Sequence, residues 1–269
     1  MIQNKIWVTS DWHFNHDKEF IWKARGFSSI EEMNENIIKK YNSVVANDDV
    51  VYCLGDCGLG GSGKESLNKL KDCIEHLNGT IIIIRGNHCT NQRAELYKQC
   101  KNVQQVSYAD MIQYHKYHFY LSHYPTLTAN LDNNKPLRAR TINLCGHSHV
   151  KDPFADWEKG CIYHCEVDAH DGFPISLDTI IEDMKHRVLE DEARYEKQIA
   201  AIKKCFDEPF SNLKDIKFDT IIQTQPIANC DKCISTPGYD CPGVQRPFYD
   251  RCPEGHEYER DPPDGGYYG

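Results

Sequence analysis

The run of four isoleucines from Ile81 to Ile84 sets the strictest condition on how this chain folds. β-Branched side chains pack well in strands, and a run that is apolar at every position has two faces to bury. A strand of that kind lies inside a sheet that is covered by other layers on both sides. The run ends in Arg85-Gly86-Asn87-His88, where polar side chains abruptly replace apolar ones. The sequence therefore predicts a layered α/β fold with polar groups at the end of a central strand.

The same arrangement, an apolar run followed by an acidic or histidine side chain, occurs at four other places. These runs are followed by Asp11 and His13, by Asp56, by His123, and by the stretch Gly146-His147-Ser148-His149. A further strand is expected over residues 161–167, and helical patterns cover about residues 29–45, 64–77 and 92–100. Strands that alternate with helices and carry polar groups at their carboxyl ends predict an open or sandwiched α/β sheet. Its active cleft would lie along one edge.

A change in composition divides the chain near residue 176. Apolar residues spaced by three, four or seven predict one long helix, with the stripe Ile181, Met184, Val188, Tyr195, Ile199, Ile202 and Phe206. Most of the 12 prolines follow Asp207. We therefore expect a core domain over residues 1–176, a long amphipathic helix over 177–206, and a Cys- and Pro-rich tail over 207–269. The helical stripe has to pack on the core or on a second copy of the chain, which predicts a homo-oligomer as one assembly.

The overall composition limits the class of protein. The chain is 40% hydrophobic and 26% charged, which is typical of a globular protein rather than a disordered one. A formal net charge of −9 argues against a protein that coats long nucleic acids. No apolar run approaches the roughly 20 residues that a membrane span requires. The first residues show no signal-peptide pattern, so we expect a cytoplasmic location and no membrane partner.

The 13 cysteines fall into two groups. Nine are scattered singly between Cys53 and Cys205, mostly in or beside apolar runs, as reduced and buried thiols are in cytosolic proteins. The other four crowd into the tail as Cys230, Cys233, Cys241 and Cys252. Their spacing is compatible with a structural four-thiolate Zn²⁺ site, with His256 as an alternative ligand. The competing interpretation is a flexible tail with incidental thiols.

The candidate ligands at the strand ends form a mixed set of carboxylate, amide and imidazole donors. They are Asp11, His13, Asp56, Asn87, His123, His147 and His149. Such a set suits Mn²⁺, Fe, Zn²⁺ or Ni²⁺ better than thiolate-preferring metals or all-oxygen Ca²⁺ sites. Seven donors exceed the needs of one four-coordinate ion. They suit two divalent ions about 3.5–4 Å apart that share a bridging carboxylate.

The ordered motifs Asp-x-His, Gly-Asp, Gly-Asn-His, His and Gly-His-x-His resemble those of the calcineurin-like metallophosphoesterase superfamily. The resemblance covers roughly residues 5–175 and extends to small bacterial and phage members that open with Ser-Asp-x-His-Phe-x-His. It implies a two-sheet α/β sandwich and two metal ions, with Mn²⁺ favoured. It places Asp11, His13 and His149 on the first metal, Asn87, His123 and His147 on the second, and Asp56 between them. His88 corresponds to the histidine beside the phosphate, the usual general acid.

The chemistry expected of such a site is hydrolysis of a phosphomonoester or phosphodiester. Two cations lower the pKa of a bridging water, and the resulting hydroxide attacks phosphorus in line with the leaving oxygen. His88 can then protonate the leaving oxygen. Asp56 is followed by Cys57-Gly58-Leu59, not by the Asp-Arg-Gly of Ser/Thr protein phosphatases, which argues against protein phosphatase activity.

Substrate choice and catalysis leave alternatives open. His16 and Arg85 are the candidate substrate contacts, and a nucleotide or a short nucleic acid is the favoured substrate. Nuclease and cyclic-nucleotide phosphodiesterase activities are not separated by the sequence, because loops decide the choice of substrate. The alternative from another class is a non-catalytic scaffold on the same fold that keeps the metals but performs no hydrolysis.

Overall fold

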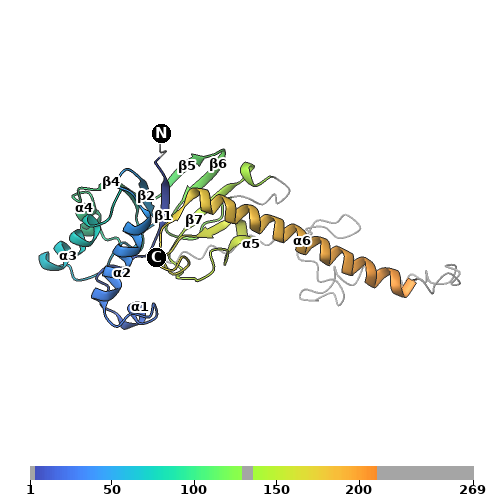
Figure 1. Cartoon of the computed structure of the whole chain (residues 1–269), viewed down its shortest axis with the longest axis horizontal. Helices are drawn as coiled ribbons and strands as arrows, with labels where there is room; N and C mark the ends of the chain where they lie inside the picture. Colours follow the sequence, from blue (N-terminus) through green and yellow to red (C-terminus); the bar gives the residue numbers. More distant parts are fainter. Residues whose placement is uncertain (1–3, 129–135, 211–269) are drawn as a thin grey trace, which may run out of the picture. The chain divides into compact units, whose positions relative to one another are not determined.

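The computed structural model describes residues 4–128 and 136–210, with side chains up to residue 204, and contains two β-sheets (Figure 1). The larger sheet has the strand order β4-β3-β2-β1-β9, and the smaller sheet has the order β5-β6-β7-β8. The larger sheet consists of the parallel strands β1 (Ile6–Thr9), β2 (Val50–Cys53), β3 (Thr80–Ile84) and β4 (Val103–Ser107), with β9 (Ile175–Ser176) antiparallel to β1. The smaller sheet consists of the hairpin β5 (Asp110–Tyr114) and β6 (Tyr117–Leu121), followed in parallel by β7 (Thr141–Cys145) and β8 (Ile162–His164). The predicted two-sheet α/β fold is confirmed.

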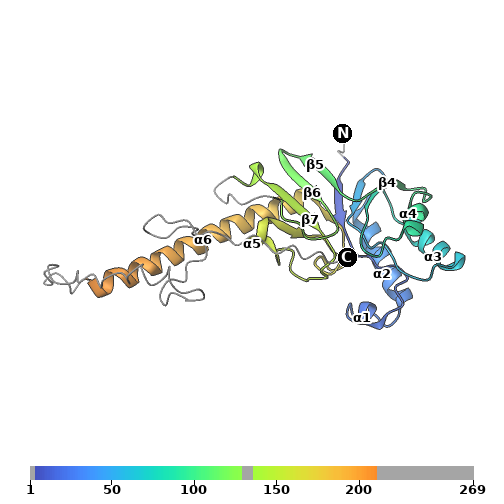
Figure 2. The ribbon, with the colours of Figure 1, turned by 180° about the vertical axis from the view of Figure 1, so that it is seen from behind.

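Helices pack on the face of the larger sheet that is turned away from the smaller sheet, as both views show (Figures 1 and 2). They are α2 (Ile30–Val44), α3 (Lys64–Glu75) and α4 (Asn91–Tyr97). The start of α2 follows from its sequence, because Ser29 Oγ accepts a hydrogen bond from Glu32 N at 3.1 Å. Glu32 in turn accepts from Ser28 N at 2.7 Å, which satisfies two amide groups at the helix start. The shorter helices are α1 (Glu19–Trp22), η1 (Leu137–Ala139) and α5 (Trp157–Gly160).

Strand β3 is buried on both faces, as the run of isoleucines predicts. Ile81 and Ile83 belong to the hydrophobic core between the larger sheet and the helices. Ile82 and Ile84 belong to the second core, which lies between the two sheets. Side chains alternate across a strand, so one run of four apolar residues supplies both cores. The cleft-forming carboxyl ends of the strands are thereby fixed by packing on two sides.

The long C-terminal helix is confirmed as α6 (Leu177–Phe210). Its first turns are buried in the second core through Leu177, Ile181 and Met184. Further along, Leu189, Tyr195 and Ile202 are 61%, 65% and 52% exposed. The chain divides into two units between Ala201 and Ile202, within α6. The division at residues 176 and 206 that the sequence suggested stays a prediction.

Three local features differ from the expectations or were missing from them. Strand β8 covers only Ile162–His164. It cannot begin earlier, because Cys161 has a left-handed backbone with φ +56° and ends α5. The predicted strand over 161–167 was therefore too long. The two-residue strand β9 was not expected, and neither was β4.

The cysteines of the described side chains are free thiols. Seven of these eight thiols are buried, and Cys73 is half-buried. Burial raises the pKa of the Cys145 and Cys165 thiols well above the usual value, so these groups stay protonated. Within residues 4–128 and 136–210, no helix has the length and hydropathy needed to cross a membrane.

Candidate metal centre

The ligand candidates follow β1, β2, β3, β6 and β7 at their carboxyl ends, and backbone hydrogen bonds connect the loops in which they lie. Asp11 N donates to Gly55 O at 3.1 Å, which joins the loop after β1 to the loop after β2. Gly146 N donates to His123 O at 3.0 Å, which joins the corresponding loops of the smaller sheet. Neighbouring parallel strands end at the same edge of a sheet, so residues far apart in sequence meet there.

Most of the ligand candidates have a left-handed backbone, which is unfavourable for residues other than glycine. The φ angles are +59° at Asp11, +52° at His13, +46° at Asp56, +76° at His147 and +51° at His149. Each such residue costs of the order of 1–3 kcal/mol, and it persists only where the surroundings determine the conformation. Backbone strain of this kind is concentrated at functional sites, and here it falls on five of the seven candidates.

Two glycines allow the carboxylates to approach the backbone closely. A Cβ atom on Gly86 would lie 2.2 Å from Asp56 Oδ1. A Cβ atom on Gly146 would lie 2.0 Å from Ser10 Oγ and 2.3 Å from Asp11 Oδ2. These distances are far below van der Waals contact, so the Gly-Asn-His and Gly-His-x-His motifs need glycine for steric reasons.

Asp11, His13 and His149 form the first group of candidate ligands. Asp11 Oδ1 is buried without a hydrogen-bond partner among the described residues, and it lies 3.6 Å from His13 Nε2 and 3.7 Å from His149 Nε2. The other oxygen, Oδ2, accepts from Ser10 Oγ at 2.6 Å and from His147 N at 2.8 Å. One oxygen therefore holds the loops together while the other is left to face two imidazole nitrogens.

The charge of Asp11 is fixed by its neighbours. Burial raises the pKa of this carboxyl, but the nearby imidazoles of His13, His123 and His149 outweigh burial and lower it to about 2. The pKa of His13 is lowered, chiefly by burial. A buried carboxylate beside a neutral imidazole is the kind of pair that binds a divalent metal ion.

Asp56, His123, Asn87 and His147 form a second group on the other side of the centre. Asp56 Oδ2 lies 3.4 Å from His123 Nε2 and 4.0 Å from His13 Nε2, so this carboxylate faces both groups. Asn87 Oδ1 lies 2.8 Å from His123 Nε2 and 3.0 Å from His147 Nδ1. Asp11, Asp56 and His123 also have ligand atoms close enough to share one ion.

The tautomer of His123 shows that this second group suits a cation. His123 Nδ1 lies 2.8 Å from Leu54 O, and a carbonyl oxygen can only accept, so Nδ1 carries the hydrogen. In the neutral ring, Nε2 then has a lone pair that faces the oxygens of Asn87 and Asp56. Burial lowers the pKa of His123, but the hydrogen bond and charge of Asp56, together with the charge of Asp11, raise it overall. Nε2 and the two oxygens therefore need a positive charge among them, which either a proton on Nε2 or a metal ion bound in its place can supply.

His88 and His16 lie beside the two groups. His88 N donates to Asp56 Oδ1 at 2.9 Å, and His88 Nε2 lies 3.9 Å from Asp56 Oδ2 with 39% of the side chain exposed. His16 Nδ1 lies 3.0 Å from His13 Nδ1 and is buried behind that ring. Burial, followed by the charges of His13 and His88, lowers the pKa of His16 to about 4, so this ring is neutral. His88 therefore has access to solvent, while His16 supports a candidate ligand.

Arg85 interacts with the loop after β3. Its guanidinium donates to Cys89 O at 2.7 Å and to Asn91 Oδ1 at 3.0 Å. It also donates to Tyr108 Oη at 2.6 Å and lies over the Tyr108 ring, 4.7 Å from the centroid. These contacts hold the segment that follows His88. A direct contact of Arg85 with substrate stays a prediction.

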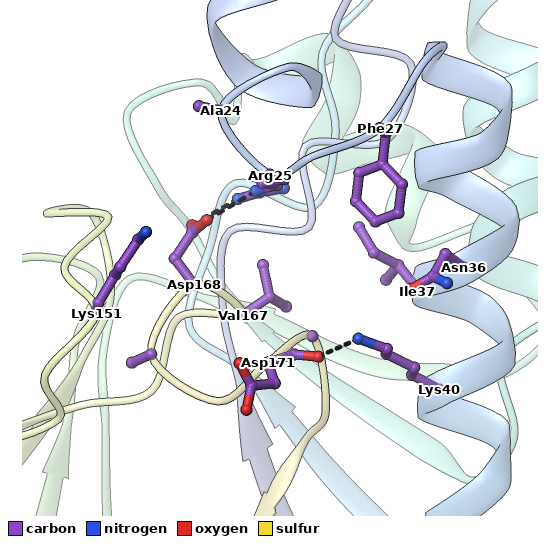
Figure 3. A pocket seen from close by; sticks show the side chains of 12 residues that line it. Ala24, Arg25, Phe27, Asn36, Ile37, Lys40, Lys151, Val167, Asp168 and Asp171 are labelled. Atoms are coloured by element: carbon purple, nitrogen blue, oxygen red, sulfur yellow. Dashed lines mark hydrogen bonds and ion pairs between the residues drawn. The ribbon is translucent and has the colours of Figure 1, made fainter.

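Two residues outside the motifs, Arg25 and Asp168, support the first group from behind. Asp168 Oδ2 lies 2.7 Å from His149 Nδ1, which fixes the hydrogen on Nδ1 and turns Nε2 toward Asp11. Arg25 donates to both oxygens of Asp168, at 2.9 and 2.7 Å (Figure 3). It also donates to Asp11 O at 2.8 Å. Burial raises the pKa of Asp168, but the hydrogen bonds with His149 and Arg25 lower it far below its usual value. The sequence analysis did not identify this pair, although Asp168 follows β8 as the ligands follow their own strands.

The comparison with protein families agrees with this geometry. Residues 5–164 match the calcineurin-like phosphoesterase superfamily domain, which is more than half of the chain. The chain belongs to this superfamily. The resemblance that the five sequence motifs indicated is thereby confirmed.

Two of the proteins that this chain resembles have no known function. An uncharacterized protein of Methanocaldococcus jannaschii, MJ1445, is 33% identical over 186 residues, which are 68% of this chain and 92% of the relative. The solved structure of AQ665 from Aquifex aeolicus, a protein of unknown function, covers 67% of this chain and 99% of its own, with 20% identity and a TM-score of 0.49. Pseudomonas putida nuclease MPE is 19% identical with a TM-score of 0.34, and covers 54% of this chain and 61% of its own. The activity of this chain has to be inferred from its own residues.

The candidate tail site lies outside the described residues. It comprises Cys230, Cys233, Cys241 and Cys252, so the structural Zn²⁺ that their spacing suggests stays a prediction.

Proposed function

We propose that this protein is a dinuclear metal-dependent phosphoesterase. The observation that carries the proposal is the set of acceptor atoms that face one another at the strand ends. Asp11 Oδ1 is buried and unpartnered among the described residues, and His123 Nε2 lies 2.8 Å from Asn87 Oδ1. An unpaired buried acceptor such as Asp11 Oδ1 is costly unless a cation is bound beside it.

The residue roles in this proposal follow the two groups. Asp11, His13 and His149 hold the first ion, Asn87, His123 and His147 hold the second, and Asp56 faces both. Mn²⁺ is the favoured metal, and Fe, Zn²⁺ and Ni²⁺ suit the same mixture of donors. Two bound divalent ions supply a strong nucleophile at neutral pH and neutralise the charge of the phosphoryl oxygens.

His88 is the proposed general acid. The backbone amide of His88 is fixed on Asp56 Oδ1 at 2.9 Å, and 39% of its side chain is exposed to an incoming substrate. A proton held on this ring can pass to the leaving oxygen when the phosphoester bond breaks. His16 and Arg85 remain the proposed substrate contacts, and they also support His13 and the segment after His88.

A nucleotide or a short nucleic acid is the favoured substrate, in either a phosphomonoester or a phosphodiester. Two exposed aromatic residues lie beside the candidate ligands. Phe20 is 69% exposed and packs with its ring centroid 5.8 Å from that of His16. Tyr124 is 50% exposed and packs 4.7 Å from His147. Aromatic rings on both sides of a metal centre suit the stacking of bases. The buried free thiols support a reducing, cytoplasmic location.

The test is hydrolysis of p-nitrophenyl phosphate and of bis-p-nitrophenyl phosphate by protein loaded with Mn²⁺. We expect turnover of at least one ester, its loss with chelator, and two metal ions per chain by elemental analysis. Failure to hydrolyse either ester with two ions bound would favour the alternative, a metal-bound scaffold. A subsequent screen of nucleotides, cyclic nucleotides and short oligonucleotides would identify the substrate class.

A further inference from the structure

A cavity of about 380 Å³ lies behind the candidate metal centre (Figure 3). Its wall comes from the segment before α2, from α2 itself and from the loops after β7 and β8. Arg25 forms part of this wall and donates on its other side to Asp11 O at 2.8 Å. The Arg25–Asp168 pair therefore separates the cavity from the ligand side of His149. This volume is at the lower end of the range for small-molecule sites, about 300–1,000 Å³.

The charges around the cavity favour an anion. Arg25 is neutralised by its two hydrogen bonds to Asp168. That leaves Lys40 and Lys151 against a single carboxylate, Asp171, which is exposed and therefore screened by water. In Figure 3, Lys40 and Lys151 enter the cavity from opposite sides. The net positive charge of this lining favours an anion.

Lys40 is held in place before any ligand arrives. Its ammonium donates to the backbone oxygen of Asp171, which uses one of its three N–H groups. The same ammonium lies over the Phe173 ring, 5.2 Å from the centroid. Gly172 has φ +83°, and a Cβ atom there would lie 3.1 Å from Lys40 Cδ. The loop after β8 is thus shaped around this lysine, and an ordered side chain loses less entropy on binding.

The rest of the cavity wall is apolar with one amide. Phe27, Ile37 and Val167 line it, together with Asn36. Figure 3 shows the ring of Phe27 beside Ile37 on the α2 side. Ile37 and Val167 are only 2% and 4% exposed, so the half-buried Phe27 offers the main apolar surface to an organic ring.

We propose that this cavity binds a small organic phosphate of the size of a nucleoside monophosphate. Its phosphate group lies between Lys40 and Lys151, and its ring packs on Phe27 with Asn36 as a hydrogen-bond partner. The site is separate from the metal centre and does not depend on hydrolysis there. Arg25 contacts both, so occupancy of the cavity affects the position of Asp11 and His149.

The proposal is tested by calorimetric titration of full-length, metal-loaded protein with AMP, using inorganic phosphate as the comparison ligand. Lys40→Gln and Lys151→Gln each remove one charge and keep a polar side chain that is one atom shorter. We expect each to weaken AMP binding at the cavity by about tenfold or more, since a hydrogen bond to a charged group is lost. Lys39→Gln on the same helix is the matched control, because Lys39 lines a different groove, and it should leave the affinity unchanged.

Amide chemical shifts of ¹⁵N-labelled protein distinguish this site from the metal centre. AMP should shift the amides of residues 167–172, and Lys40→Gln should remove those shifts while the shifts around Asn87 and His88 remain. Shifts confined to Asn87 and His88, or unchanged AMP affinity in both lysine variants, would overturn the proposal. If inorganic phosphate binds as tightly as AMP, the proposed contact with an organic ring is wrong. The same conclusion follows if Phe27→Ala leaves the AMP affinity unchanged. None of these readouts requires turnover, so a failure of the proposed hydrolysis is a separate result.

Discussion

Asp168→Asn separates the support of a candidate metal ligand from the ligand itself. The carboxylate accepts from His149 Nδ1 at 2.7 Å and from Arg25 at 2.9 and 2.7 Å. Asparagine keeps one oxygen of similar position but replaces the other with an amide nitrogen, which cannot accept. One of the two partners therefore loses its acceptor, and the negative charge that favours the Nδ1–H tautomer of His149 disappears.

The expected loss in metal affinity can be worked from this geometry. Removing the outer partner of a metal-binding histidine typically costs about 10–100-fold in affinity, or about 1.4–2.8 kcal/mol. The fold itself also loses stability, because Arg25 and Asp168 are only 9% and 15% exposed. Breaking a buried ion pair costs about 3–5 kcal/mol. Arg25 keeps its bonds to the carbonyls of Asp11 and Trp12, so we expect a loss of about 2 kcal/mol.

The dependence on pH has a defined sign. The folded protein holds the pKa of Asp168 below the unfolded value of about 3.9. A lowered carboxyl pKa contributes stability that is present above the unfolded pKa and is lost as pH falls toward the folded one. Asp168 also raises the pKa of His149, and that contribution is lost as pH rises above about 6.5. The difference in unfolding free energy between the parent and Asp168→Asn should therefore be largest at about pH 5–6, shrink below about pH 4 and decrease again above about pH 6.5.

The assay has two arms, because bound metal itself stabilises the fold. Calorimetric titration with Mn²⁺ gives the metal affinity, and urea unfolding in excess chelator gives the stability without metal. Asp171→Asn is the matched control. It makes the same change in the same loop, at a residue with φ +51° that asparagine tolerates. If folded Asp168→Asn bound Mn²⁺ within twofold of the parent, or Asp171→Asn lost as much affinity, the proposed role of Asp168 would be refuted.

Further predictions concern the ligands, the acid, a glycine and the tail. Asp56→Asn should lose at least one metal ion and the hydrolytic activity together, measured by elemental analysis and turnover, because it removes the charge that faces both groups. His88→Ala should keep both ions and reduce turnover by about 10²–10⁴, most for esters with poor leaving groups; equal hydrolysis of an alkyl phosphate would exclude it as the acid. Gly146→Ala places a Cβ atom 2.0 Å from Ser10 Oγ, so thermal unfolding should show a loss of about 1–3 kcal/mol or more and metal binding should weaken. Truncation after Asp207 should leave the turnover of a small phosphoester intact, and its loss in a folded core would place the tail in the active site.

Local sequence patterns predicted the parts of the fold that local forces determine. The alternation of Ile81–Ile84 between two cores follows from the strand period, and the start of α2 follows from the capping residues Ser29 and Glu32. The candidate ligands were also accessible from sequence, since each directly follows an apolar run and parallel strands end at a common edge. Their individual roles on each metal remain proposals.

The features that were missed depend on contacts between distant residues. Arg25 and Asp168 are 143 positions apart, and neither lies in a periodic pattern or in a motif. Strand β9 has two residues and exists because Val8 and Ile175 pair across the sheet edge. The strand propensity of the two β9 residues alone does not predict that they pair with β1. The exposed residues of α6, such as Tyr195, show that a helical stripe predicts the helix without predicting what covers it.

The left-handed backbone at five ligand candidates makes the closed loop conformation unfavourable by itself, so metal binding and loop closure are expected to be coupled. Loops that hold unfavourable φ angles at Asp11, Asp56 and His147 are closed by a few hydrogen bonds and by two close glycine contacts. Ions that bind only this closed arrangement add their binding free energy to it. Without metal these loops can open and sample many conformations. Each ion that binds would stabilise the closed conformation. Hydrogen exchange of these loops should therefore slow when the protein is loaded with metal.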